Sequence, residues 1–90
     1  MSEIKVIKLI TSEEILGEFV SSNIDTITVN RPRVIQVMNT QGAAGLMPYL
    51  VSDPDIKNVS FPRAHIITSF DASKELTDAY LRATTGLLLG

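Results

Sequence analysis

The feature that most constrains the fold is the segment of residues 6–29, in which three short apolar stretches are separated by two polar turns. The first stretch is rich in β-branched and long aliphatic side chains, as strands are. The second stretch, residues 15–20, contains Gly17. A glycine inside a helix costs about 1 kcal/mol, so a strand is predicted there in preference to a helix capped by Ser12. The segment therefore predicts short strands joined by tight turns.

Two places in the predicted strands indicate that the sheet is not flat. Val6 and Ile7 are adjacent apolar residues, which indicates a bulge or burial on both faces of the sheet. Pro32 interrupts an otherwise continuous strand over residues 26–38. Because proline is tolerated only at an edge or a bend of a sheet, we expect this strand to bend at residues 30–33.

The C-terminal part of the chain changes period and predicts a helix over residues 73–85. One face of that helix carries apolar residues at i, i+3, i+4 and i+7, namely Leu76, Ala79, Tyr80 and Ala83. Ser73 or Asp71 can cap its start and Gly86 its end. The predicted class is all-β with a terminal helix. The remaining strands are predicted at residues 46–51, 59–61 and 65–70.

Size and composition predict a single domain spanning residues 1–90. The chain has 90 residues, of which 44% are hydrophobic, and no cysteine that could form a disulfide or a thiolate metal site. A core of this size is only marginally sufficient, so we expect part of the apolar surface to be buried against other copies of the chain. Neither a signal peptide nor a membrane-spanning run is recognisable, which predicts a cytoplasmic protein with no membrane partner.

The residue types needed for catalysis are scarce. A nucleophile needs an adjacent base, yet the chain has one histidine, His65, and no cysteine. The Gly-x-Ser-x-Gly pattern is absent, and the glycines at residues 42–45 lack the lysine of a phosphate-binding loop. The sequence therefore predicts a non-catalytic protein without a metal or cofactor.

The charge distribution limits the partners. A net charge of −2 argues against wrapping a nucleic-acid backbone over a large surface, although one localised binding site remains open. Arg31 and Arg33 flank the predicted bend and are expected to face solvent. Arg63 stands two residues before His65, the only histidine in the chain.

Two motifs in this order resemble those of the Sm and LSm family. In that family a glycine in the second strand is followed two positions later by an apolar residue and then by acidic or amide loop residues. Gly17 and Phe19 match this pattern, and Asn23 or Asp25 stands where the family's acidic and amide residues occur.

The second family motif is a short basic turn between the last two strands, arginine-glycine in LSm proteins and lysine-histidine in the bacterial Hfq branch. Arg63 and His65 resemble that turn, with one residue between them. The chain differs from the family in lacking the arginine-glycine pair and an N-terminal helix. The strings GLMPYL and YLRATTG and the strand beginning at His65 are similar to small Sm-like proteins of marine cyanophages.

The resemblance implies a small, open, Sm-like or SH3-like barrel of five strongly bent antiparallel strands over about residues 3–70, followed by the helix. It also implies a homo-oligomeric ring that binds single-stranded RNA, with DNA as an alternative, for nucleic-acid processing. The nucleic-acid-binding residues would be Asn23, Asp25, Arg63 and His65. If the chain is phage-encoded, its location would be the host cytoplasm.

A second hypothesis remains open beside this one. The same small barrel can serve as a structural or adaptor module of a phage or assembly complex that holds a protein partner, and the acidic balance of the chain favours that function.

Overall fold

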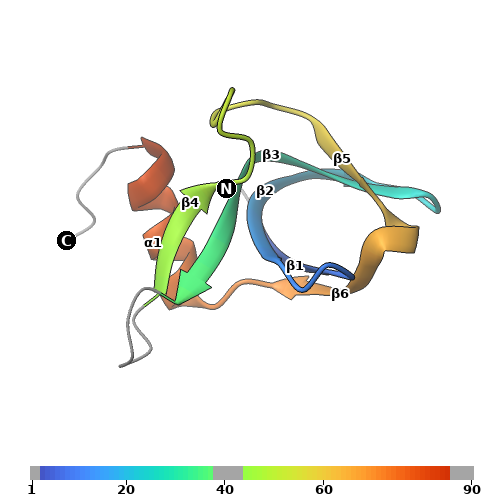
Figure 1. The fold of residues 1–90 in the computed structure, drawn as a ribbon, viewed down its shortest axis with the longest axis horizontal. Helices are drawn as coiled ribbons and strands as arrows, with labels where there is room; N and C mark the ends of the chain where they lie inside the picture. The colour runs from blue at the N-terminus through green and yellow to red at the C-terminus, as the bar shows by residue number, and fades with distance from the viewer. Residues whose placement is uncertain (1–2, 38–43, 86–90) are drawn as a thin grey trace.

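The computed structural model describes residues 3–37 and 44–85, which form an antiparallel sheet and a C-terminal helix (Figure 1). The predicted helix cap Gly86 lies outside the described residues. In chain order the elements are β1 (Ile4–Leu9), β2 (Glu14–Ser22), β3 (Thr26–Val37), β4 (Ala44–Pro48), β5 (Val59–Pro62), the 3-10 turn η1 (Arg63–His65), β6 (Ile66–Asp71) and α1 (Lys74–Thr85).

The sheet runs in the order β4-β3-β2-β1-β6, and β5 pairs with β3 beside this path. All the pairings are antiparallel. Within the described ranges β5 does not pair with β6, because η1 joins the two strands, so the sheet is bent but not closed.

The five strands that the resemblance implies were wrong in number, since the described chain has six, as the residue pattern predicts. The cause is the bend in β3. Its residues 33–37 pair with β4 and its residues 26–29 pair with β5, so one edge of β3 carries two short strands instead of one long one. The loop of residues 49–58 connects those two strands.

The predicted bend in β3 is confirmed at Arg31, whose φ of 49° lies in the left-handed region. Between the pairs Leu16–Arg33 and Glu18–Asn30, β3 has one residue more than β2, which is a bulge. A non-glycine residue in this conformation costs of order 1 kcal/mol. The surroundings offset that cost, since the Arg31 amide donates to the carbonyl oxygen of Ile56 at 2.7 Å.

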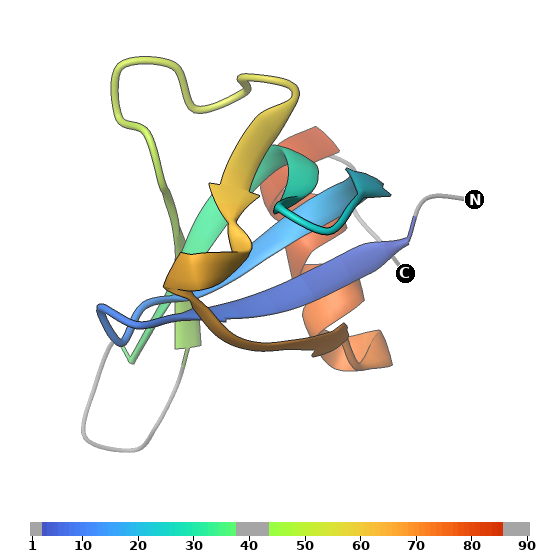
Figure 2. The same ribbon diagram turned by 90° about the vertical axis from the view of Figure 1, so that its right-hand side faces the viewer.

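Burial on both faces, one of the two expectations for Val6 and Ile7, is confirmed. They are 1% and 0% exposed, and they belong to separate apolar clusters. One cluster lies on the face covered by β5 and consists of Ile7, Leu9, Ile15, Ile27, Val29 and Phe61. The other lies on the face covered by α1 and consists of Ile4, Val6, Leu16 and Tyr80. Figure 2 shows α1 behind the strands and β5 in front of them.

The helix begins where Ser73 predicts. The Ser73 hydroxyl accepts a hydrogen bond from the Leu76 amide at 3.2 Å, which satisfies one of the free N–H groups of the first turn. Tyr80 is fully buried on the apolar face of α1. The strand predicted at residues 46–51 instead spans Ala44–Pro48, because the chain turns away after Pro48.

Candidate functional site

Three of the four predicted site residues meet at one corner of the sheet, which we call the Arg63 corner (Asn23, Asp25 and Arg63). The Arg63 amide donates to the carbonyl oxygen of Asp25 at 2.8 Å, and the Arg63 Nε donates to the carbonyl oxygen of Asn23 at 2.6 Å. The turn between β2 and β3 is thus fastened to η1 by two hydrogen bonds. Two segments that are far apart in the sequence become one surface.

Asn23 shapes its own turn. Its side-chain Oδ1 accepts hydrogen bonds from the amides of Asp25 at 2.8 Å and Thr26 at 2.9 Å. This is an Asx turn, in which the side chain replaces a backbone acceptor. Among the described residues, the Asn23 Nδ2 and the Asp25 carboxylate make no hydrogen bond or ion pair, so these groups remain for a ligand.

Arg63 is exposed and is oriented by its Nε bond. Within residues 3–37 and 44–85 its two terminal nitrogens have no hydrogen-bond or ion-pair partner. A guanidinium presents these donors in a planar fork that fits a phosphate or stacks on a base. The two terminal nitrogens of Arg63 are therefore available to a ligand.

The charge around the Arg63 corner is not basic. A small pocket of about 200 Å³ beside it is lined by Glu3, Lys5, Phe19, Ser22, Ile27, Arg63 and Ser69. Lys5 Nζ lies 2.7 Å from Asp71 Oδ1 and 3.8 Å from Glu3 Oε1. Two cations, Lys5 and Arg63, thus stand among three carboxylates once Asp25 is included. A phosphate at this corner would meet only a weak attraction.

The Lys5–Asp71 pair joins the neighbouring strands β1 and β6. The hydrogen bond to Asp71 raises the pKa of Lys5, and the same bond lowers the pKa of Asp71. Both groups are therefore held in their charged forms at neutral pH. No local pattern in the sequence marks this pair, because the two residues are adjacent only through strand register.

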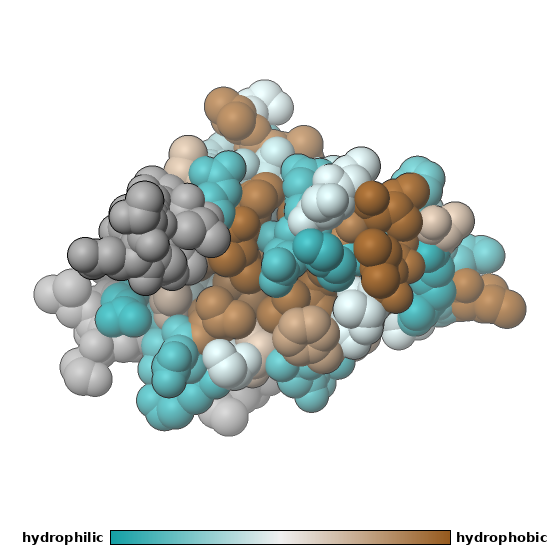
Figure 3. Space-filling view, turned by 60° about the horizontal axis from the view of Figure 1, so that its bottom comes forward, coloured by the Kyte–Doolittle hydropathy of each residue, from teal (hydrophilic) through white to brown (hydrophobic). Residues whose placement is uncertain are grey.

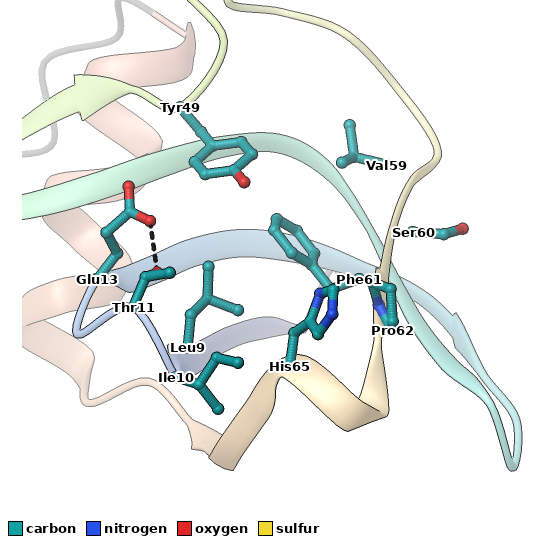
Figure 4. A pocket seen from close by; sticks show the side chains of 10 residues that line it. All are labelled: Leu9, Ile10, Thr11, Glu13, Tyr49, Val59, Ser60, Phe61, Pro62 and His65. Carbon is teal, nitrogen blue, oxygen red and sulfur yellow. Dashed lines mark hydrogen bonds between the residues drawn. The ribbon is translucent and has the colours of Figure 1, made fainter.

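His65 does not join the Arg63 corner. It lines a larger pocket of about 430 Å³, which shares no lining residue with the smaller one (Figure 4). We call this the His65 pocket, and its lining residues are Leu9, Ile10, Thr11, Glu13, Tyr49, Val59, Ser60, Phe61, Pro62 and His65. The predicted four-residue site is thus divided between two places that flank η1.

The expectation that Arg33 faces solvent was wrong. Its side chain is 7% exposed, and its Nη2 lies 3.0 Å from Asp55 Oδ1. Its Nη1 donates to the carbonyl oxygens of Pro54 and Arg31. The bend in β3 places Arg33 under the loop of residues 49–58. Its guanidinium binds this loop and is not available to a ligand.

Arg31 is also partly covered, with a side chain 26% exposed and its Nη2 3.6 Å from Glu18 Oε1. Its Nε is buried and has no hydrogen-bond partner in the described structure. Neither arginine beside the bend faces solvent fully, in contrast to what the sequence predicted.

The outer strands of the sheet carry exposed apolar side chains. Met47 on β4 is 45% exposed, and Ile67 and Phe70 on β6 are 62% and 50% exposed. Figure 3, in which the lower side of Figure 1 comes forward, shows apolar side chains set among hydrophilic ones. Edge strands with such side chains can pair with another chain.

The described ranges lack two other kinds of site. No group of three or more histidine or carboxylate side chains there could hold a metal ion. No helix in the part that the structure describes has the length and apolar character needed to cross a membrane.

No family model matches the chain, and no curated protein matches it significantly.

Proposed function

We propose that the chain is an Sm-like protein that assembles into a homo-oligomeric ring and binds single-stranded RNA, or single-stranded DNA, without catalysis. The observation that supports this most is the Arg63 corner. Two turns separated in the chain by β3, β4 and β5 are hydrogen-bonded to each other and leave guanidinium, amide and carboxylate groups at the surface. Single-stranded nucleic acids are read by such groups on exposed loops.

The two outer strands of the sheet, β4 and β6, support the proposal of a ring. β4 and β6 each have one unpaired edge in the described sheet, and both expose large apolar side chains. Head-to-tail pairing of β4 of one copy with β6 of the next would cover both edges. Such a heterologous contact gives a closed ring when the rotation between copies closes.

The carboxylates near the Arg63 corner reduce the affinity of each single site for nucleic acid. The repetition of that site around a ring offsets the loss. In a ring, one oligonucleotide can contact several Arg63 corners, and each further contact is made at a high effective concentration. We therefore expect short oligonucleotides to bind poorly and oligonucleotides that span several subunits to bind far better.

The test compares Arg63→Ala with Arg82→Ala, which removes the same charge from an exposed position on α1. Fluorescence anisotropy with labelled RNA and DNA oligomers at several salt concentrations measures affinity, and light scattering measures mass. Arg63→Ala should weaken binding and reduce the salt slope by about one for each phosphate that Arg63 binds, whereas Arg82→Ala should leave affinity unchanged and neither variant should change the mass. A monomeric mass, or no binding to any oligomer at low salt, would refute the proposal.

A protein-binding adaptor is the second candidate, and one observation favours it. Beside the Arg63 corner, Lys5 is paired with Glu3 and Asp71, which leaves little net positive charge for an anionic partner. Capture from a lysate prepared without nuclease, followed by mass determination of the bound material, separates the two candidates. A stoichiometric protein partner that binds equally well to wild type and Arg63→Ala, with no nucleic acid bound, would replace the first candidate by this one.

A further inference from the structure

The His65 pocket has the size and lining of a small-ligand site. Its volume of about 430 Å³ falls in the range of pockets that hold small molecules, which are apolar with a few placed polar groups. Its apolar lining includes Leu9, Val59 and Phe61. The pocket opens where β5 passes the turn between β1 and β2 without pairing to it (Figure 4).

An aromatic ring forms one wall of this pocket. The rings of Tyr49 and Phe61 are 5.3 Å apart at an angle of 58°. The backbone holds Tyr49 in place, because its amide donates to the carbonyl oxygen of Pro32 at 3.1 Å. Figure 4 shows Tyr49 across the opening from Leu9 and Ile10. A flat ligand can therefore lie between an aromatic ring and aliphatic side chains.

A fixed carboxylate stands at one side of this slot. The Thr11 hydroxyl donates to Glu13 Oε1 at 2.9 Å, and the Leu9 amide donates to the Glu13 carbonyl oxygen at 2.9 Å. Glu13 is half-buried, and its Oε2 has no hydrogen-bond partner in the described part of the chain. The carboxylate is thus positioned by its turn and keeps acceptor capacity.

The imidazole of His65 stands at the other side of the slot (Figure 4). The backbone fixes its position, since the Ile10 amide donates to the His65 carbonyl oxygen at 2.9 Å. An imidazole N–H can donate to an acceptor on the ligand. The pocket therefore offers an acceptor at one side, a donor at the other and flat apolar surfaces between them.

We propose that the His65 pocket binds a guanine base. Guanine is planar, its N1–H and exocyclic amine are adjacent donors for the Glu13 carboxylate, and its N7 and O6 are acceptors for His65. Adenine has no N1–H, and each pyrimidine offers the carboxylate a single donor group. The base stacks on Tyr49, as flipped-out bases do on aromatic side chains.

This inference adds a base preference to the proposed function. It rests on that function, because the bound base would belong to the nucleic-acid strand. Arg63 and His65 belong to the same three-residue turn η1, so one nucleic-acid strand can meet both. Arg63 would contact the sugar-phosphate chain, and the His65 pocket would select the base. The ring would then bind single strands with a preference for guanine.

The test uses the whole chain with the four nucleoside monophosphates and with homopolymeric oligonucleotides. Calorimetry should show that guanosine monophosphate binds more tightly than adenosine monophosphate by about ten- to a hundredfold, the range that one two-pronged contact supplies. Glu13→Gln should remove that preference. Glu14→Gln is the matched control, because Glu14 is the next residue, carries the same charge and pairs with Lys8 outside the pocket.

A second variant keeps the test independent of folding. His65 is exposed, so His65→Ala should leave the fold intact, as circular dichroism can verify, and should weaken guanosine monophosphate binding. Equal affinity for all four nucleotides would overturn the inference, as would equal behaviour of Glu13→Gln and Glu14→Gln. So would an apolar peptide that binds the pocket when no nucleotide does.

The two proposals fail in different ways. Oligonucleotide binding that depends on Arg63 but not on base identity would overturn the guanine pocket and leave the proposed function standing. Binding of guanosine monophosphate that depends on Glu13, without binding of any oligonucleotide, would support the pocket and refute the nucleic-acid ring.

Discussion

Val29 occupies the space that a side chain at Gly17 would need. A Cβ on Gly17 would lie 2.6 Å from Val29 Cγ2 and 2.7 Å from Val29 Cβ, and both distances are shorter than real contacts between carbon atoms. The close approach occurs where β3 bends over β2 beside its bulge. Val29 itself is fully buried in the cluster on the β5 face.

Gly17→Ala should therefore destabilise the fold by about 1–3 kcal/mol, because the added methyl group must displace a buried side chain. Urea unfolding followed by circular dichroism measures the change in stability. Val29→Ala is destabilising by itself, but it removes the Cγ2 atom at 2.6 Å and leaves the Cβ atom at 2.7 Å, so it relieves part of the clash. Gly17→Ala should accordingly cost less in a Val29→Ala background than in the wild type, although its cost should not disappear. Equal costs in the two backgrounds would contradict the steric explanation.

Tyr80 fastens the helix to the bend, and removing its hydroxyl should have a measurable cost. That hydroxyl donates towards the carbonyl oxygens of Asn30 at 2.9 Å and Arg31 at 3.0 Å. Tyr80→Phe keeps the ring and leaves these acceptors without their donor, which should cost about 1–3 kcal/mol in denaturant unfolding. Thr84→Val, which removes a hydroxyl bonded only to its own helix at the Tyr80 carbonyl oxygen, is the control and should cost less.

The same tyrosine predicts a pH dependence. Burial raises the pKa of Tyr80 above its ordinary value of 10.0, so the folded chain holds the neutral phenol. Its contribution to stability is fully present below pH 10 and disappears as the pH rises towards the folded pKa. Thermal unfolding between pH 9 and pH 11 should show a decline that is smaller in Tyr80→Phe. The same slope in both proteins would contradict the assignment.

Arg33 and Asp55 form a pair whose two ends differ in burial, with side chains 7% and 68% exposed. Arg33→Ala should cost about 1–3 kcal/mol, because it removes the donor from two carbonyl oxygens under the loop. Asp55→Ala should cost about 1 kcal/mol or less, since water can replace an exposed carboxylate. Chemical denaturation ranks the two variants, and a larger cost for Asp55→Ala would show that the charge pair dominates.

The Lys5–Asp71 pair predicts a dependence on acid. The Lys5 hydrogen bond lowers the pKa of Asp71 below its ordinary 3.8, so the pair stabilises the fold above that pH and its contribution disappears as the pH falls through the folded pKa. Below pH 4, the free energy of unfolding should therefore decrease less with falling pH in Asp71→Asn than in the wild type. Asp53→Asn, in the loop after β4, should leave that decrease unchanged, and equal curves for all three proteins would contradict this role.

Local signals predicted most of the elements. Gly17, the polar turns and Pro32 indicated short strands and a bend, and the structure has β2 over Glu14–Ser22 and the left-handed Arg31 in β3. Ser73 indicated the start of α1. These features depend on neighbours along the chain, such as side-chain periodicity, steric limits of proline and the capping of free N–H groups, and such interactions can be read from sequence.

The candidate site was predicted in part, for a physical reason. Asn23 and Asp25 form a local Asx turn, which their residue types favour. Asn23 and Asp25 lie beside Arg63, and His65 lies apart from all three, because of the way η1 docks against the β2–β3 turn. Docking of this kind is decided by the register of strands that are distant in sequence. Pocket residues such as Tyr49 and Glu13 were not predicted, because nothing near them in the chain marks a site.

The sequence alone determined the strand-rich pattern, the bend in β3 and the helix at the end, since each follows from short-range sterics and periodicity. Only the tertiary structure decided that β3 carries two short strands at one edge, that Arg33 is buried, and that η1 separates two pockets. These outcomes depend on burial and on hydrogen bonds between segments remote in the chain. A single sequence does not record such partners.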